Sequence, residues 1–420
     1  MNYIVFFIVL IAACFLIHRV PFIKRSGLGA RLLLFLFLFK ILAGVLQGYI
    51  TQLYFPGSDT WLMNDFSYME YGILQKDPSR FFREIVVSNY NGGGYNNIFG
   101  SYGSFWNDLE LNLITKGLAP FNFISRGNYY INSILFNFFG FFGHIALFRI
   151  FAHTCKGKTL PILAGCFLIP TFLFFSSAIG KDNIAFTLLA LFCFALYFFS
   201  LGGFTFKRWL WLLFFFLGIL LMRNHMALLL VPPAIAFYIS LKKRKNPWAV
   251  FGIMLVIVVV LIGIVPLLAP GLNPGAIISQ KQQDFIALGE ANTQIRLSAL
   301  DPSVAGLVKN LPEAFLHGFF RPYITDATNF FTAAEVAEIL LFAGLWLITV
   351  YRAARSGAYK CIHPFMLFCI TLCCMVFIMN GYIVPNSNTL VRYRSIYLPL
   401  LATPMLCSVW GNKQIKFKNI

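Results

Sequence analysis

Charged residues are scarce in this sequence, and acidic ones are the scarcest. Aspartate and glutamate number 15 in 420 residues, against 33 lysines and arginines, and charged residues make up only 11% of the chain. Hydrophobic residues make up 59% and aromatic residues 18%. A soluble globular domain cannot bury that much apolar surface, so this composition excludes that class and indicates a protein whose solvent is the lipid bilayer.

Long polar stretches are also rare, and apolar runs of roughly 18–22 residues recur along the whole chain. In lipid, every backbone polar group needs a partner within the protein, so each run is expected to be a helix. The sequence therefore predicts an all-α polytopic membrane protein, a single integral membrane domain over 1–420 with about 11 transmembrane helices. The expected spans are 2–18, 31–50, 129–149, 159–178, 183–201, 208–222, 226–241, 248–269, 336–351, 364–380 and 395–410.

The basic residues predict the orientation of these spans. More than half of them fall in alternate loops that hold no acid, such as the run Lys242-Lys243-Arg244-Lys245. The positive-inside rule places these loops in the cytoplasm, with the N-terminus outside and the C-terminus inside. The positive charge is then a topology signal with some attraction to anionic lipid, and it gives no support to nucleic-acid binding.

The sequence lacks several motifs that mark nucleotide-binding and metal-binding sites. There is no GxxxxGK[ST] phosphate loop, no CxxC pair and no Cys/His cluster with metal-ligand spacing. The nine cysteines all fall in predicted spans or cytoplasmic loops, so no disulfide, metal or cofactor is expected. Because the cytoplasmic connectors are too short for an ATPase, any chemistry is expected at the outer face, driven by a substrate's stored energy or an ion gradient.

Two outer segments are long, the first at 51–128 and the second at 270–335. The first mixes Trp61, Met63 and Phe66 with polar neighbours, which predicts short amphipathic helices on the membrane surface, and the glycine-rich stretch 89–97 predicts a hinge between them. In the second, Pro302 and Pro312 predict two helix starts.

Lys181 and Asp182 stand together between two apolar runs, at the predicted outer mouth of two spans. One interpretation is a helix start, where aspartate favours the helix dipole and lysine reaches the lipid headgroups. The other is a pocket in which the pair meets a phosphate or a sugar hydroxyl, because charges at membrane depth are costly and mark functional sites.

Asp59 follows closely after the second predicted span, in a Pro-Gly turn that holds it near the membrane plane. It is a candidate general base for a sugar hydroxyl, and the alternative is a helix N-cap. Arg223 and His225 break an apolar run; they form either a plain outer turn or a site where arginine binds phosphate and histidine moves protons.

Three further arginines lie at predicted outer span ends. Arg321 occurs in Phe-Arg-Pro, and Arg392 and Arg394 flank Tyr393 in Arg-Tyr-Arg. Two arginines can grip a diphosphate while the tyrosine ring stacks on a sugar; the alternative is the interfacial belt of aromatic and basic residues found at span ends. Taken with Lys181, Arg223 and His225, these cations predict convergence on one anionic ligand.

Two other features of the sequence are weaker indications of a functional site. Lys40 interrupts a span, where it either pairs with an acid or substrate group inside the bundle or extends to the headgroups. Asp108 and Glu110 give only a weak hint of a metal, and no metal is assigned.

The long first outer loop, the aspartate at the membrane edge and the FRP and RYR motifs resemble bacterial O-antigen and exopolysaccharide polymerases and related GT-C-type membrane glycosyltransferases. The resemblance covers the whole chain. It implies a multi-pass protein of the bacterial inner membrane that uses a polyprenyl-diphosphate-linked saccharide, with Asp59, Asp182 and His225 as catalytic candidates and the cations as substrate ligands. Some polymerases carry an arginine eleven residues before a glycine in both loops; here this occurs only at Arg83 and Gly94, so polymerase and single-sugar transferase both stay open.

Two other classes of function are considered. A transporter or lipid-linked saccharide flippase would use Lys40, Lys181 and Asp182 along a gated path, although the sequence lacks the paired halves typical of transporters. A non-catalytic partner of other polysaccharide-assembly membrane proteins is the third interpretation.

Overall fold

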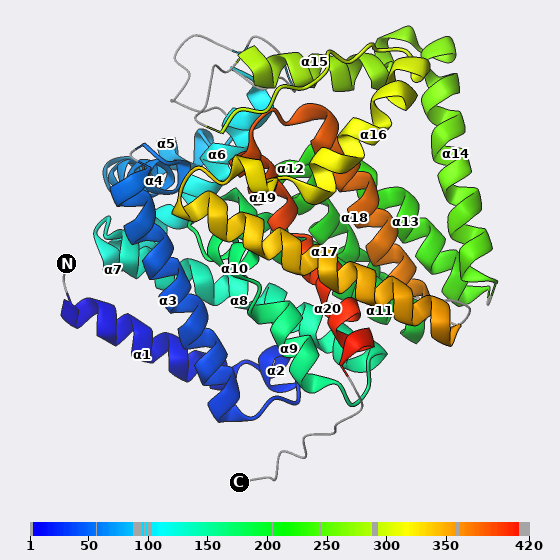
Figure 1. Ribbon diagram of the computed structural model, residues 1–420. Helices are drawn as coiled ribbons and strands as arrows, with labels where there is room; N and C mark the ends of the chain where they lie inside the picture. The colour runs from blue at the N-terminus through cyan, green and yellow to red at the C-terminus, as the bar shows by residue number, and fades with distance from the viewer. Residues whose placement is uncertain are drawn as a thin grey trace. The chain divides into compact units, whose positions relative to one another are not determined.

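The computed structural model describes residues 3–55, 57–86, 95, 98, 103–203, 205–243, 245–287, 293–357 and 362–410. Most of the predicted hinge at 89–97, as well as Gly94 and Arg244, lies outside the described residues. The regular secondary structure of the described residues is helical (Figure 1), apart from one isolated antiparallel bridge between Gln294 and Asn386. The chain divides into two compact units.

The first unit comprises residues 1–147, 173–191 and 215–223. Its own helices are α1 (Tyr3–Arg19), α2 (Pro21–Lys24), α3 (Ala30–Tyr54), α4 (Asp59–Lys76), α5 (Pro78–Arg83), α6 (Phe105–Leu118), η1 (Ala119–Phe121) and α7 (Asn122–Ser125). It shares α8 (Tyr129–Thr154), α10 (Pro170–Ser176), α11 (Lys181–Gly202) and α12 (Phe206–Met222) with the second unit.

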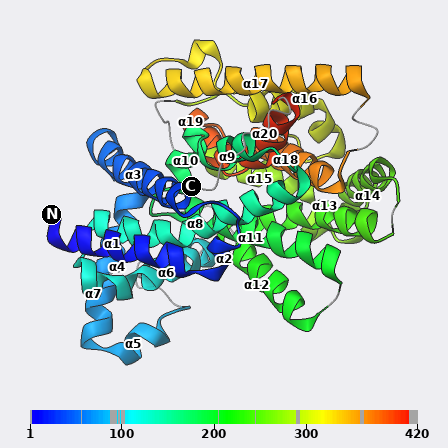
Figure 2. The ribbon, with the colours of Figure 1, turned by 90° about the horizontal axis from the view of Figure 1, so that it is seen from below.

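The second unit comprises residues 148–172, 192–214 and 224–420. Its own helices are α9 (Thr159–Phe167), α13 (Asn224–Lys242), α14 (Pro247–Leu268), η2 (Pro270–Leu272), α15 (Pro274–Ala287), α16 (Val304–Phe320), η3 (Ile324–Asp326), α17 (Phe330–Ser356), α18 (Pro364–Ile383), α19 (Ser387–Ser395) and α20 (Leu398–Val409). Within this unit α13 packs against α14 and α18 (Figure 2).

Seven helices of the described chain are long and apolar enough to cross a membrane: α3, α8, α11, α13, α14, α17 and α18. The bent pair α9 and α10 makes eight if it counts as one broken span. The fold is thus a polytopic helical membrane protein, as the sequence predicts. The other predicted spans correspond to shorter helices, namely α1 and α12 with 17 residues each and α20 with 12, so the count of about 11 crossings and the orientation stay predictions.

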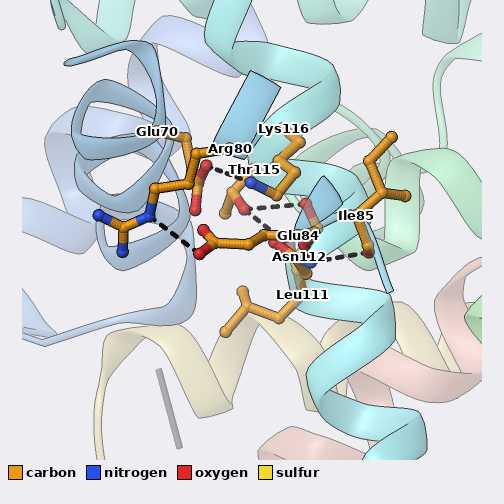
Figure 3. A network of polar contacts seen from close by, with 8 residues as sticks. All are labelled: Glu70, Arg80, Glu84, Ile85, Leu111, Asn112, Thr115 and Lys116. Carbon is orange, nitrogen blue, oxygen red and sulfur yellow. Dashed lines mark hydrogen bonds and ion pairs between the residues drawn. The ribbon is translucent and has the colours of Figure 1, made fainter. Parts of the chain in front are cut away.

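In the predicted first outer segment, buried polar contacts join the described helices to one another. Lys116 of α6 forms an ion pair of 2.5 Å with Glu70 of α4, and both side chains are almost wholly buried (Figure 3). The Lys116 ammonium also lies 4.5 Å from the centre of the Phe81 ring. Nearby, Asn112 donates to the carbonyls of Glu84 and Ile85 at 2.7 and 2.8 Å. A buried pair is costly to break from one side, so this ion pair holds α4 and α6 together.

In the predicted second outer segment α15 precedes α16, and the structure has one helix, α16, where two starts were predicted at Pro302 and Pro312. Pro302 precedes the helix start as expected: Ser303 caps α16 by accepting a hydrogen bond from the Gly306 amide. Pro312 was predicted to begin a further helix, and this is wrong, because it lies inside α16.

Candidate functional site

Four charged side chains of the first unit form two adjoining ion pairs, here called the charge cluster: Glu110, Lys181, Asp182 and Arg223. Lys181 Nζ lies 3.0 Å from Glu110 Oε2, and Arg223 Nη2 donates to Asp182 Oδ1. Asp182 and Glu110 are 3% and 4% exposed, whereas the Lys181 side chain is 27% exposed. The cluster is therefore buried on its acidic side and open at Lys181.

Contacts along α6 place Glu110 at this position. Ser104 caps the helix by accepting a hydrogen bond from the Asn107 amide at 3.2 Å. One residue into α6, the Trp106 indole donates to the Leu221 carbonyl at the end of α12, with an N–O distance of 2.9 Å. Glu110 follows Trp106 by one helical turn and Arg223 follows Leu221 by two residues, so this one bond brings the two charged groups to the same region.

The other two members of the charge cluster are the first two residues of α11. They follow a short break, 177–180, between α10 and α11. Lys40 donates to the Ser176 carbonyl at 2.6 Å, and Asn137 donates to the Ser177 carbonyl at 2.8 Å. Carbonyls at a helix end have no partner within the helix, and in lipid they have no water. Lys40 and Asn137 supply these partners and so fix the chain just ahead of Lys181.

Small residues allow this close packing. A side chain at Gly44 of α3 would meet Asn137, Ser133 and the Ser177 carbonyl at 2.5–2.9 Å. Lys40 lies one helical turn before Gly44 and is only 1% exposed. Of the two sequence interpretations of Lys40, the structure agrees with a side chain directed into the protein, although it bonds to a backbone carbonyl and the Ser177 hydroxyl and not to an acid.

An apolar cavity of about 360 Å³ lies in the same unit, among α6, α8 and α11. Its lining is apolar except for Asn183 and Thr187 of α11, and it includes Leu113 and Ile114 of α6. Leu113 is three residues from Glu110, and Asn183 is adjacent to Asp182. The lining of the cavity thus begins within three residues of the charge cluster on α6 and directly after it on α11.

The electrostatics of the charge cluster centre on Glu110. Burial raises the pKa of its carboxyl, and the nearby Lys181 charge opposes this shift. Glu110 Oε1 is buried and has no hydrogen-bond partner among the described residues. With two cations and two acids, the fully ionised cluster has no net charge. Such a site offers both donors and acceptors to a ligand and a carboxyl that holds a proton more readily than usual.

Asp59 lies in the first unit as well, but in the first turn of α4 with an exposed side chain. The helix cap is Ser58, one residue earlier than the cap considered from the sequence. The two ion pairs thus bring together Lys181, Asp182 and Arg223, with Glu110 as the fourth member. Asp59 lies on a separate helix, α4.

The second unit contains the remaining predicted residues. Arg321 lies at the carboxyl end of α16, where its guanidinium contacts Asp326 at 2.9 and 3.3 Å and His317 Nε2 at 3.1 Å. Burial, followed by the charge of Arg321, lowers the pKa of His317. Burial opposes ionisation of Asp326, but the bonds from Arg321 and the Tyr323 amide outweigh it and lower the pKa of Asp326.

Arg394 of α19 is 3% exposed, and its Nη1 donates to the carbonyls of Gly318, Phe319 and Arg321. Burial lowers its pKa to about 10. Its guanidinium thus caps the end of α16. The neighbouring Arg392 and Tyr393 are half-buried. His225 is half-buried in the first turn of α13.

Glu110 is the residue that sequence reasoning missed as a site residue, having noted it only as a weak metal hint. The available signal was an acid between Leu109 and Leu111, in a stretch where apolar residues predict an amphipathic helix. Among the described residues, no group of three or more His, Cys, Asp or Glu side chains could hold a metal ion. Comparison with known proteins adds no assignment, since no family model, curated protein or solved structure matches the chain.

Proposed function

We propose that this protein transfers or polymerises sugars at the outer face of the bacterial inner membrane, using a polyprenyl-diphosphate-linked saccharide as donor. The observation that carries the proposal is that one compact unit holds both the charge cluster and an apolar cavity, with residues of α6 and α11 contributing to each. A lipid-linked sugar has an apolar chain joined to a polar head, and binding sites combine apolar walls with a few well-placed polar groups.

Within this proposal the cavity receives part of the isoprenoid chain. Its volume of about 360 Å³ and its apolar lining suit several branched hydrocarbon units near the diphosphate. Of the residues that line the cavity, only Asn183 and Thr187 are polar, and both belong to α11, the helix that begins at Lys181. The diphosphate would then lie toward Lys181, the most exposed cation of the charge cluster.

Glu110 is the proposed proton acceptor. The acceptor hydroxyl oxygen forms a bond to the anomeric carbon, the bond from that carbon to the diphosphate oxygen breaks, and the diphosphate leaves with the electron pair. The hydroxyl proton passes to Glu110 Oε1, which is buried and has no hydrogen-bond partner among the described residues. A carboxyl with a raised pKa is a better base than an ordinary one, and Lys181 and Arg223 offer positive charge to the leaving group.

Under this proposal, only some of the cations predicted from the sequence bind the diphosphate. Lys181 and Arg223 belong to the same unit as Glu110, and Asp182 holds Arg223 in place. Arg394 already binds three carbonyls, and Arg321 is held by Asp326 and His317. Asp59, Asp182 and His225 remain alternative catalytic residues, and Arg321, Arg392, Tyr393 and Arg394 remain alternative substrate ligands.

The test uses the purified protein in detergent with a polyprenyl-diphosphate-linked oligosaccharide, and the products are separated by size. New glycosidic bonds in the absence of any sealed compartment support an enzyme. Glu110→Gln should lower the rate by about 100-fold or more, the usual contribution of a general base. Glu84→Gln, in the same outer segment but paired with Arg80, is the matched control and should keep the activity. Activity that survives Glu110→Gln would remove Glu110 from the mechanism, and no product from the wild type would refute the enzyme.

The buried amine of Lys40 favours a second candidate, a transporter or flippase of lipid-linked saccharides. An ionisable group at mid-span is by default a functional hypothesis in a membrane protein. Movement of the same lipid across sealed vesicles containing the protein, without new glycosidic bonds, would support this candidate over the enzyme.

A further inference from the structure

One glycine lines the apolar cavity of the first unit without a reason in the packing of the chain. Gly117 is the next-to-last residue of α6, and glycine forms a helix less readily than alanine does. Its φ is not positive, and a side chain placed there would meet no heavy atom within 4 Å. Neither the backbone nor steric crowding therefore requires glycine at this position, where the missing side chain leaves its room to the cavity.

Gly140 of α8 is the second glycine in the lining, and the structure explains it. A side chain there would lie 2.2 Å from Asn183 Oδ1, so Gly140 allows α8 and α11 to approach each other closely. Thr187 Oγ1 donates to the Asn183 carbonyl at 2.7 Å, so this hydroxyl is already bonded within α11. The cavity wall is thus closed by protein contacts on this side, whereas it is open at Gly117.

The exposed residues of the lining mark where the cavity opens. Gly117 is exposed, and the Phe139 side chain of α8 is 54% exposed. By contrast, Ile114 and Leu118 of α6 are buried. Because α8 is long and apolar enough to cross a membrane, a hydrocarbon chain can reach this opening from the bilayer.

We propose that Gly117 determines which hydrocarbon chain the site accepts: the bare position admits the methyl branches of an isoprenoid chain, and a larger residue there excludes them. This inference rests on the proposed function, which supplies a lipid-linked saccharide with such a chain. With no neighbour within 4 Å of the Cβ position, a ligand carbon can pack directly on the α6 backbone at the usual contact distance of about 3.5–4.0 Å. A branched chain is thicker than a straight one and needs this room.

The order of the lining residues relates this chain to the charge cluster. On α11 the lining begins at Asn183, directly after the charge cluster, and on α6 it begins at Leu113, three residues after Glu110. Gly117 lies about one further helical turn along α6. With the diphosphate at the charge cluster, the isoprene units that follow it would therefore pass Gly117.

The test measures chain binding without sugar transfer. The purified full-length protein in detergent is irradiated with a polyprenyl phosphate that carries a diazirine on its isoprenoid chain, and mass spectrometry identifies the labelled peptides. The competitors are unlabelled polyprenyl phosphate and a straight-chain alkyl phosphate with the same number of carbon atoms. In the wild type we expect labelling of the cavity walls on α6, α8 or α11, with the branched competitor the stronger of the two.

Two substitutions of Gly117 separate its role from general stability. Gly117→Leu should reduce labelling about tenfold or more, the usual effect of a misplaced methylene group in an apolar pocket. Gly117→Ala should weaken the branched competitor more than the straight one, a change in selectivity that a loss of stability would not produce. Gly72→Leu is the matched control, since Gly72 of α4 also has no neighbour within 4 Å but does not line the cavity, and its labelling should match the wild type. Unfolding midpoints no lower than that of the wild type would show that each variant is folded.

Three results would overturn the proposal: no labelling of the cavity walls in the wild type, wild-type labelling in Gly117→Leu, or equal weakening of both competitors in Gly117→Ala. The proposed function fails by a different result. A wild type that binds the chain as expected but forms no glycosidic bonds would refute the transferase and support chain selection at Gly117. New glycosidic bonds together with unchanged labelling in Gly117→Leu would refute the role of Gly117 alone.

Discussion

Lys40 Nζ lies 2.6 Å from the carbonyl oxygen of Ser176, at the point where α10 ends inside the first unit. The amine contacts the Ser177 hydroxyl at 3.4 Å as well. The partners of this buried amine are therefore uncharged, and its effect is to satisfy the backbone at a helix break that leads directly into Lys181 and Asp182.

Replacing Lys40 with methionine should destabilise the protein by about 1–3 kcal/mol, because the Ser176 carbonyl would lose its donor in a buried place. Thermal unfolding in detergent measures this loss. Lys76→Met is the matched control, since Lys76 is exposed in the last turn of α4, and it should leave the midpoint unchanged. An unchanged midpoint for Lys40→Met would contradict the capping role.

Removing one partner of the pair between Arg223 and Asp182 should cost more than removing both. Arg223→Met leaves a carboxylate that is 3% exposed without its guanidinium, and such losses are typically about 3–5 kcal/mol. Combining it with Asp182→Leu should recover part of this cost. Unfolding measurements on the two single variants and the double variant form the cycle. Costs that simply add would show that the two groups do not interact.

Gly381→Ala should strongly destabilise the second unit. A side chain there would lie 1.9 Å from the Ala314 carbonyl oxygen of α16, so one backbone must move. We expect a loss of about 3 kcal/mol or more, in the range of the severe steric defects. Gly344→Ala is the control, because nothing lies within 4 Å of that position in α17, and it should raise stability by up to about 1 kcal/mol through helix propensity. Equal effects of the two substitutions would contradict the close α16–α18 crossing.

The stability of the second unit should fall on acidification through His317. Its pKa is lowered by burial and by Arg321, so below about pH 6.5 the unfolded chain binds more protons than the folded one. Its stabilising effect is complete above that pH and is lost as the pH falls toward the lowered value. As the pH falls from about 8 to 5, the unfolding midpoint should decline more steeply in the wild type than in His317→Gln, and equal slopes for the two proteins would contradict this role of His317.

The long apolar helices and the start of α11 could be predicted from the sequence because each depends on local information. Apolar run length marks a helix in lipid, and the polar pair Lys181-Asp182 marks where one begins. Pro312 was misread because proline is equally compatible with a first turn and with a helix whose packing compensates for it.

The sequence predicted three residues of the charge cluster as site residues, but neither their pairing nor the fourth residue. Lys181, Asp182 and Arg223 stand out as charges between apolar runs, but their pairing depends on a contact between α11 and the residue after α12. Glu110 could not be assigned because its position depends on the Trp106–Leu221 bond, which joins residues far apart in the chain. Whether Arg321 or Arg394 faces solvent or backbone carbonyls is likewise set by tertiary packing, so residue type alone predicts cation placement poorly.

The break between α10 and α11 has one more consequence. The carbonyls of Ser176 and Ser177 are occupied by Lys40 and Asn137, so these two backbone groups need no water molecule just ahead of Lys181 and Asp182. In a transferase, fewer water molecules held near an activated sugar would mean that the sugar passes to its intended acceptor instead of being lost to hydrolysis.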